Sequence, residues 1–167
     1  MKEAELIEEL IGEIQKSRLM LEKIDAFYRD FKENDFRILG KKRTTGIVLA
    51  EIVTDFYTCL ETLFLRISQF FENSLKPDKW HSDLLRKMTI NIQGVRKAVI
   101  SDQTYPILLE LMKFRHFKRY YFEFDYDWDK LEFLEKKYND VRYFLNMDLD
   151  EFEAFLEQQS QDKTGLF

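Results

Sequence analysis

The amino-acid sequence predicts an all-helical protein, an antiparallel up-and-down four-helix bundle with one or two additional short helices. The chain of 167 residues contains only 5 glycines and 2 prolines, whereas an all-β fold needs turn residues every ~8–12 positions. Apolar residues recur at steps of three and four over long stretches, which is the period of an amphipathic helix. Charged residues make up 34% of the chain and 16 residues are phenylalanine. This composition suits helices with charged outer faces around an aromatic core.

The apolar period and the helix-breaking residues together predict six helices. Their approximate ranges are 2–36, 45–73, 78–89, 102–122, 127–146 and 148–158. Ser101 is the expected N-cap of the fourth helix. Asp148, with Glu151 three residues later, resembles a capping box and predicts that a new, short helix begins there. We expect one domain over residues 1–159 and a frayed tail over residues 160–167.

Charge is distributed unevenly along the chain, although the net charge is −5. The overall negative charge argues against a protein that coats nucleic acid non-specifically. Residues 84–119, however, carry 8 basic and 2 acidic side chains, between two acidic segments. This basic middle segment is either a site for a polyanion or one solvated face that meets another.

The usual signatures of enzymes and of metal sites do not occur in the sequence. Cys59 is the single cysteine and there are two histidines, so no zinc motif and no internal disulfide is expected. There is no glycine-rich phosphate loop, GxSxG elbow, HExxH or CxxC motif. We therefore expect no cofactor and no metal. The acidic N-terminus is unlike a signal peptide, and no uncharged apolar run approaches membrane-spanning length, so a cytoplasmic location without a membrane partner is expected.

Two arginines extend an apolar stripe of the fourth predicted helix. At about 100° per residue, Arg115 and Arg119 fall on the face that carries the apolar residues of this helix. A guanidinium in that position needs carboxylates or phosphate as partners, since burial without a partner is costly. One reading is structural, with pairing to acids of the second helix such as Asp55 or Glu61. The other reading is a phosphate or RNA-backbone site in a cleft or a dimer interface.

Aromatic residues and histidines accompany these arginines. Phe117, Tyr120 and Tyr121 suit the stacking of nucleic-acid bases, although core aromatics show the same spacing. His116 lies about 100° from Arg115 around the helix, and a lone helical histidine is usually a surface or capped residue. His81 lies in the first turn of the third predicted helix, where a hydrogen-bonded structural histidine is the ordinary interpretation.

Four segments, taken in order, resemble the HepT-like proteins of the HEPN superfamily. They are residues 80–88 (WHSDLLRKM, with Trp80 and His81 at its start), 94–96 (GVR), 111–119 (LMKFRHFKR) and 127–131 (DWDKL). The resemblance implies a HEPN-like helical bundle that forms a homodimer and acts as a metal-independent ribonuclease toxin. It also implies a minimal nucleotidyltransferase antitoxin as the partner.

The nuclease motif of that family is an arginine, four residues, a histidine, any residue and a tyrosine. Arg115 matches the arginine, but Tyr120 occupies the histidine position and Phe122 the tyrosine position. Cleavage through the 2′-hydroxyl of RNA needs a proton acceptor that works near pH 7, as histidine does. A tyrosine with a pKa of about 10 is a poor base there. This resemblance implies a toxin-family protein with weak or no ribonuclease activity.

The residues on which this hypothesis depends all lie in the fourth predicted helix. Arg115, Tyr120 and His116 are the catalytic candidates. The candidate nucleic-acid-binding residues are Lys113, Lys118, Arg119 and Tyr121. Two alternatives remain. One is an active endoribonuclease in which His116 or His81 replaces the missing histidine. The other is a non-catalytic helical interaction module whose arginines are structural.

Overall fold

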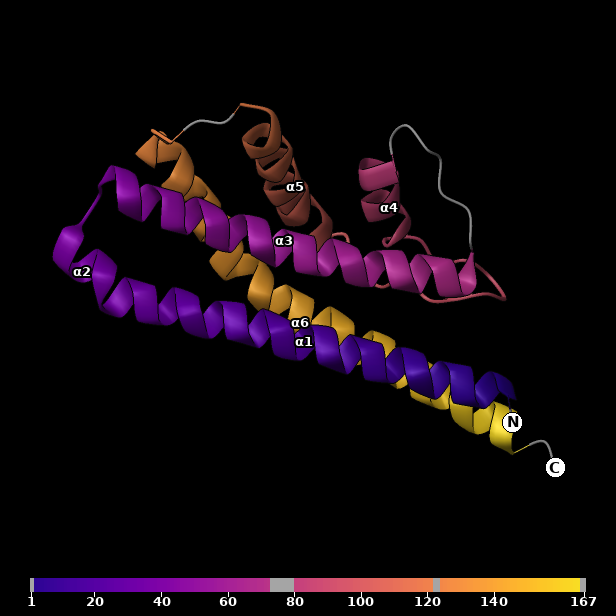
Figure 1. The fold of residues 1–167 in the computed structure, drawn as a ribbon. Coiled ribbons are helices and arrows are strands. Elements are labelled where there is room, and N and C mark those ends of the chain that lie inside the picture. Colours follow the sequence, from indigo (N-terminus) through magenta and orange to yellow (C-terminus); the bar gives the residue numbers. More distant parts are fainter. Residues whose placement is uncertain (1, 73–79, 122–123, 166–167) are drawn as a thin grey trace.

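The computed structural model describes residues 2–72, 80–121 and 124–165, and within these ranges the chain forms six α-helices and no β-strand (Figure 1). The helices are α1 (Lys2–Glu33), α2 (Asp35–Leu39), α3 (Arg43–Phe71), α4 (Trp80–Lys87), α5 (Thr104–Tyr121) and α6 (Trp128–Thr164). The predicted all-helical bundle is confirmed. The predicted helix limits at residues 73, 78 and 122 lie outside the described residues.

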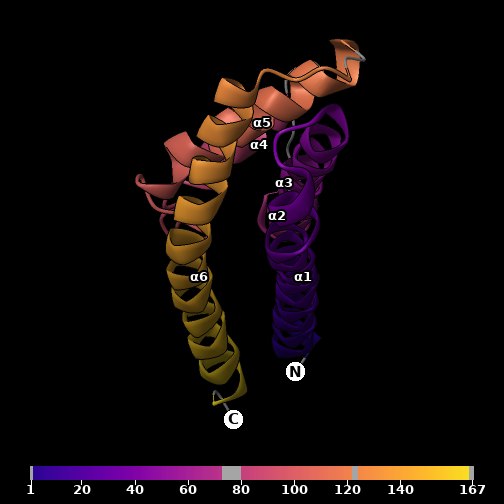
Figure 2. The ribbon, with the colours of Figure 1, turned by 90° about the vertical axis from the view of Figure 1, so that its left-hand side faces the viewer.

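The bundle is built on two long antiparallel pairs that share α1. Helix α1 runs from the N-terminus along α3 and along α6, and both of these run in the opposite direction, so that the two chain ends lie at the same end of the molecule (Figures 1 and 2). Helix α5 packs against α3 and α6, and α4 packs against α3 and α5. Helix α5 is shorter than α1, α3 and α6. Figure 1 shows that it is steeply inclined to α3.

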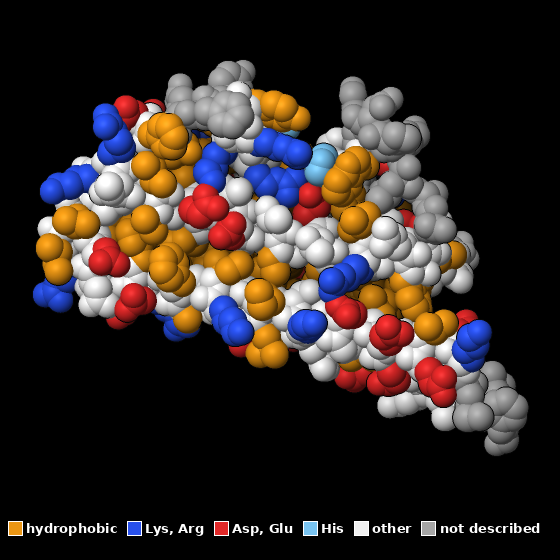
Figure 3. Space-filling view, viewed as in Figure 1, with side chains coloured by type: hydrophobic (Ala, Val, Ile, Leu, Met, Phe, Trp, Pro, Cys, Tyr) orange, Lys and Arg blue, Asp and Glu red, His pale blue; other side chains and the backbone are white. Residues whose placement is uncertain are grey.

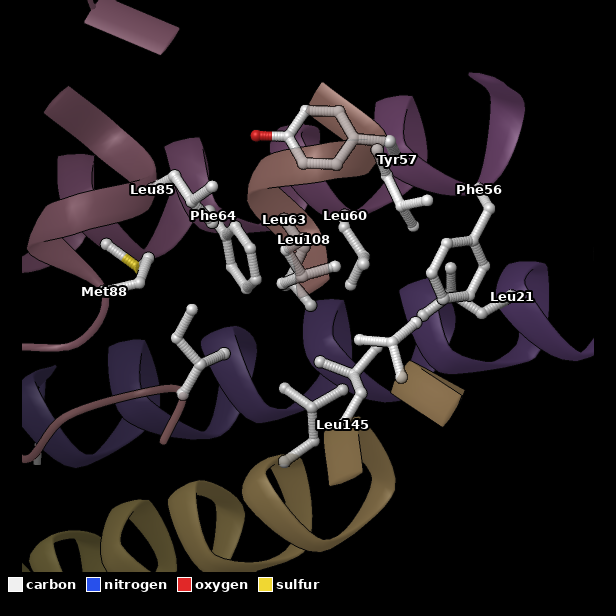
Figure 4. Packing of buried hydrophobic residues seen from close by; sticks show 14 of the residues in the cluster. Leu21, Phe56, Tyr57, Leu60, Leu63, Phe64, Leu85, Met88, Leu108 and Leu145 are labelled. Atoms are coloured by element: carbon white, nitrogen blue, oxygen red, sulfur yellow. The ribbon is translucent and has the colours of Figure 1, made fainter. Parts of the chain in front are cut away.

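The core lies along α3, the most apolar of the helices. Its buried side chains include Phe56, Leu60, Leu63 and Phe64, which pack with side chains of α1, α4, α5 and α6 (Figure 4). Aromatic rings fill the space between α1, α3 and α6, where Tyr138 makes edge contacts with Tyr28 and Phe56 at centroid distances of 4.9 Å and 5.0 Å. These contacts fix α3 as the central helix against which the site is built.

The predicted break at Asp148 is wrong, because residues 128–164 form one continuous helix. Asp148 does cap a helix, but it caps the start of α5. Its carboxylate accepts hydrogen bonds from the Ser101 backbone N–H, at 3.0 Å, and from the hydroxyls of Ser101 and Thr104. Ser101 Oγ in turn accepts from the Thr104 N–H at 3.3 Å, as expected for an N-cap residue. The acid therefore ties α5 to the middle of α6.

The predicted frayed tail is also wrong for residues 160–164, which belong to α6. Ser160 is buried and donates to Glu8 Oε1 at 2.7 Å, and Lys163 pairs with Glu3 at 3.0 Å. Helix α1 therefore supplies the partners that keep the last turns of α6 helical. No helix in the described ranges is both long enough and apolar enough to cross a membrane.

The connection between α4 and α5 is irregular and is organised by Arg96. The guanidinium is fully buried and donates to Glu72 Oε1 at 2.7 Å. It also donates to the backbone carbonyls of Lys87, Ile90 and Lys97 at 3.0–3.2 Å. One arginine of the basic middle segment is thus a structural residue of the interior and does not belong to a charged surface.

Candidate functional site

A hollow of about 570 Å³ opens between α3, α4 and α5. It is lined by Thr54, Thr58 and Glu61 of α3, Trp80 and His81 of α4, Arg115, Lys118 and Arg119 of α5, and Phe124 and Tyr126 of the following connection. Figure 3 shows lysine and arginine side chains gathered above α3, where the surface dips between the ends of α5 and α4. We call this feature the basic hollow.

Arg115 is the central side chain of the basic hollow. Its Nη2 donates to Glu61 Oε2 at 2.8 Å, and Nη1 lies 3.5 Å from Thr58 Oγ1. The guanidinium carbon lies 4.8 Å from the ring centroid of Tyr57, in the range of a cation–π contact. The side chain is 15% exposed. Arg115 is therefore fixed in place by α3 and still borders the open space.

His81 joins this pair although it lies far from Arg115 in the sequence. Its Nδ1 is 2.8 Å from Glu61 Oε2 and 3.2 Å from Arg115 Nη2. The Glu61 carboxylate only accepts hydrogen bonds and the Arg115 guanidinium only donates them, so the two neighbours of Nδ1 favour opposite tautomers. The shorter contact, to the carboxylate, favours a neutral His81 with its proton on Nδ1 and Nε2 as an acceptor. The imidazole also stacks on the Trp80 ring at 3.7 Å between centroids. Its ring orientation is thus held from two sides.

The charge balance of the basic hollow is positive. Three cationic side chains line it, and Glu61 is the carboxylate among the lining residues. Lys118 pairs with Glu51, whereas Arg119 has no carboxylate partner among the described residues. A concave surface with this excess of positive charge attracts polyanions.

The tyrosine beneath Arg115 stays a neutral phenol. Burial raises the pKa of Tyr57 well above its usual range, and the nearby Glu61 carboxylate raises it further, while Arg115 acts in the opposite direction. The Tyr57 ring therefore supports the guanidinium as an uncharged aromatic face and does not compete with a phosphate for it.

The structure separates the catalytic candidates of the sequence. His116 and Tyr120 lie on the outer face of α5 with their ring centroids 4.7 Å apart. Tyr120 is 61% exposed, and neither residue lines the basic hollow. The side chain of Tyr121 and all of Phe122 lie outside the described residues.

The other candidates fall into two groups. Lys118 and Arg119 line the basic hollow, as do Trp80 and His81. Lys113 lines a different cavity of α5 and lies 3.5 Å from Glu110. Of the two acids considered as structural partners of Arg115, Glu61 is the one that binds it. No three His, Cys, Asp or Glu side chains of the described residues are grouped to hold a metal ion.

The sequence indicated Glu61 of α3 as a possible partner of Arg115, but not that Thr54 and Thr58 line the hollow beside it. Thr54, Thr58 and Glu61 are spaced at four and three residues, which places them on one helix face. A strip of polar side chains on the most apolar helix is the sequence signal that would have identified the α3 side of the basic hollow. Phe124 and Tyr126 follow α5 in the connection to α6. No pattern in the sequence indicates that they line the basic hollow.

Fold and site together define a helical-bundle protein with an arginine–carboxylate–histidine cluster in a basic hollow. The sequence model of a family described as "HepT-like protein" matches residues 48–156. The chain therefore belongs to the HepT-like family, as the resemblance predicted, and the matched residues include every residue that lines the basic hollow. No curated protein and no solved structure matches the chain.

Proposed function

We propose that the protein is a HepT-like member of a toxin–antitoxin type system that binds RNA in the basic hollow and cuts it weakly or not at all. In this proposal it works in the cytoplasm as a homodimer with a minimal nucleotidyltransferase as partner. The observation that carries it is the placement of Arg115. This residue is fixed beside Lys118 and Arg119 in a hollow, while Tyr120 stands apart on the outer face.

RNA suits the basic hollow for two reasons. Arginine presents a planar fork of donors that matches phosphate geometry, and phosphate contacts dominate the affinity of nucleic-acid binding. Trp80, Phe124 and Tyr126 add aromatic surface beside the cations. Unpaired bases stack on such rings in proteins that bind single strands.

Weak cleavage follows from the residue at the motif's histidine position. A tyrosine is a much poorer general base than a histidine, and general acid–base catalysis is typically worth ~10²–10⁴-fold in rate. Residue 120 lies outside the basic hollow of its own chain, so the rescue depends on the proposed homodimer bringing it to RNA held by the other subunit. In that arrangement we expect Tyr120→His combined with Phe122→Tyr to raise RNA cleavage in EDTA by about that factor. No rise would mean that these two positions are not what limits the reaction.

RNA binding in the basic hollow is tested by fluorescence anisotropy with labelled single-stranded RNA at several salt concentrations. Arg119→Ala should weaken binding about tenfold and make the slope of log K against log salt shallower by about 1. Arg29→Ala is the matched control, since Arg29 is an exposed arginine of α1 paired with Asp25 and distant from the hollow lining. Equal effects of the two substitutions would contradict a binding site in the basic hollow.

One observation favours a second candidate, an active metal-independent endoribonuclease. His81, and not His116, is hydrogen-bonded to a carboxylate beside Arg115. In this candidate Nε2 of His81 takes the proton of the 2′-hydroxyl as its oxygen attacks phosphorus. The bond to the 5′-oxygen breaks, and water protonates the leaving oxygen. Arg115 and Arg119 would stabilise the charge that develops on the phosphoryl oxygens.

A pair of histidine variants decides between the two candidates. The second candidate expects RNA cleavage in EDTA by the wild type, loss of it in His81→Ala and retention in His116→Ala. RNA affinity should change little in either variant. A wild type that binds RNA and does not cut it rejects this candidate and supports the first.

A further inference from the structure

A second cavity, of about 350 Å³, shares Tyr126 with the basic hollow. It is lined by Glu110, Lys113, Phe114 and Phe117 of α5, Tyr126 and Asp127 of the connection, and Lys130 and Leu131 of α6. We call it the aromatic pocket. Its volume lies at the lower end of the range for small-molecule sites, which is about 300–1,000 Å³.

Helix α5 forms a wall between the two cavities. Phe114 and Phe117 line the aromatic pocket, and the residues that directly follow them, Arg115 and Lys118, line the basic hollow. Successive helical residues point about 100° apart. The two cavities therefore lie on different sides of α5 and have Tyr126 as a common lining residue.

The walls of the aromatic pocket are flat and apolar. The rings of Phe114 and Phe117 are nearly parallel, with an interplanar angle of 26° and centroids 6.5 Å apart. The Tyr126 ring lies 5.9 Å from Phe114. Phe114 and Leu131 are buried, so the ring surface open to a ligand comes from Phe117 and the half-buried Tyr126. Flat aromatic ligands stack on surfaces of this kind, and nucleobases are the flat groups that an RNA strand offers.

The polar groups of the aromatic pocket are balanced in charge. Two carboxylates, Glu110 and Asp127, face two ammonium groups, Lys113 and Lys130. Such a balance does not suit a phosphate. The carboxylates accept hydrogen bonds and the ammonium groups donate them. The edge of an amino-bearing base needs both, since its exocyclic amine donates and its ring nitrogen accepts. Uracil has no exocyclic amine.

We propose that the aromatic pocket is a nucleobase subsite for an amino-bearing base whose phosphate lies in the basic hollow. This deepens the proposed function and rests on it. The ligand is a base joined to a phosphate. It is either a nucleotide within an RNA strand or a free mononucleotide.

Binding of short RNA oligomers tests the base preference. Oligo(A) and oligo(C) should bind more tightly than oligo(U) of the same length, by anisotropy at fixed salt. Phe117→Ala should weaken oligo(A) binding about tenfold, because it removes a stacking surface, and should leave oligo(U) binding within about twofold. Phe70→Ala is the matched control, since both phenylalanines are 37% exposed and Phe70 does not line the aromatic pocket.

A second variant tests the polar edge without disturbing the fold. Asp127 caps α6 by accepting a hydrogen bond from the Asp129 N–H at 3.0 Å, and serine caps helices equally well. Asp127→Ser with Glu110→Met removes both carboxylate acceptors, so it should keep the melting temperature within a few degrees and bring the oligo(A)-to-oligo(U) affinity ratio towards one. An unchanged ratio overturns the proposal.

The mononucleotides AMP, CMP and UMP separate the two sources in calorimetric titrations. AMP binding that is lost in Phe117→Ala supports the free nucleotide, whereas a preference seen only in oligomers supports a residue of the strand. If Arg119→Ala weakens oligomer binding and Phe117→Ala does not, the proposed function stands and the subsite is overturned. If Phe117→Ala abolishes AMP binding while Arg119→Ala leaves all binding unchanged, the pocket binds a base but its link to the basic hollow is overturned.

Discussion

Two arginines of the basic middle segment pair with glutamates, Arg115 with Glu61 inside α3 and Arg96 with Glu72 at the C-cap of α3. They differ in whether the guanidinium can still bind another group. Arg96 pairs with Glu72 and gives its other donors to three backbone carbonyls, fully buried. Arg115 pairs with Glu61 and borders an open hollow. A saturated arginine can only stabilise the fold, whereas one with donors directed at open space can also bind an anion.

The largest effect expected from this comparison is on stability. Arg96→Ala should lower the free energy of unfolding by about 3–5 kcal/mol, because it leaves a buried carboxylate and three carbonyls without their donor. Urea unfolding followed by circular dichroism measures this loss. A cost below about 1 kcal/mol, the size expected for a surface pair, would show that Arg96 is not the structural centre of its connection.

A matched pair of glutamate substitutions sharpens the comparison. Glu72→Gln should cost about 1.5–3 kcal/mol, since it weakens hydrogen bonds to a buried charge, and should leave RNA affinity unchanged. Glu61→Gln should tighten RNA binding, because it removes the carboxylate that neutralises Arg115 in the basic hollow. Anisotropy at matched salt concentrations measures the affinity. Tighter binding by Glu72→Gln as well would remove the distinction between the two arginines.

The smallest effect concerns the helix that carries Arg115. Asp148→Ala removes the carboxylate that caps α5 and should lower the free energy of unfolding by about 1 kcal/mol. Because the cap lies at the opposite end of α5 from the basic hollow, RNA affinity should stay within about twofold. A large loss of affinity would mean that the position of Arg115 depends on the start of its helix.

The sequence allowed the helices to be predicted more reliably than their ends. Apolar periodicity located α1, α3, α5 and α6, because burial of one face dominates their formation. The break predicted at Asp148 failed because the residues of a capping box also occur in mid-helix, where the acid is free to bind a different helix. That partner, at Ser101, is fixed by tertiary packing and leaves no local signal.

The candidate site could be predicted in part. Arg115 was identified from its place on an apolar stripe, and Glu61 as one possible partner. His116 was predicted as a catalytic candidate because it follows Arg115 in the sequence. In the structure the histidine beside Arg115 is His81 of α4. The approach of α4 to α5 depends on the packing of both helices on α3, which a single sequence does not reveal.

The partnership of α1 and α6 also determines the order in which the chain can fold. Arg18 bonds to Glu153 and Tyr28 to Glu135, contacts that span more than 100 residues of sequence. During synthesis the apolar stripe of α1 therefore emerges long before one of its two main partners exists. Helices α1 to α5 are closer neighbours in the sequence and can associate earlier. We expect α6 to dock late, so that slow synthesis leaves the side of α1 that packs on α6 open to aggregation or to capture by a chaperone.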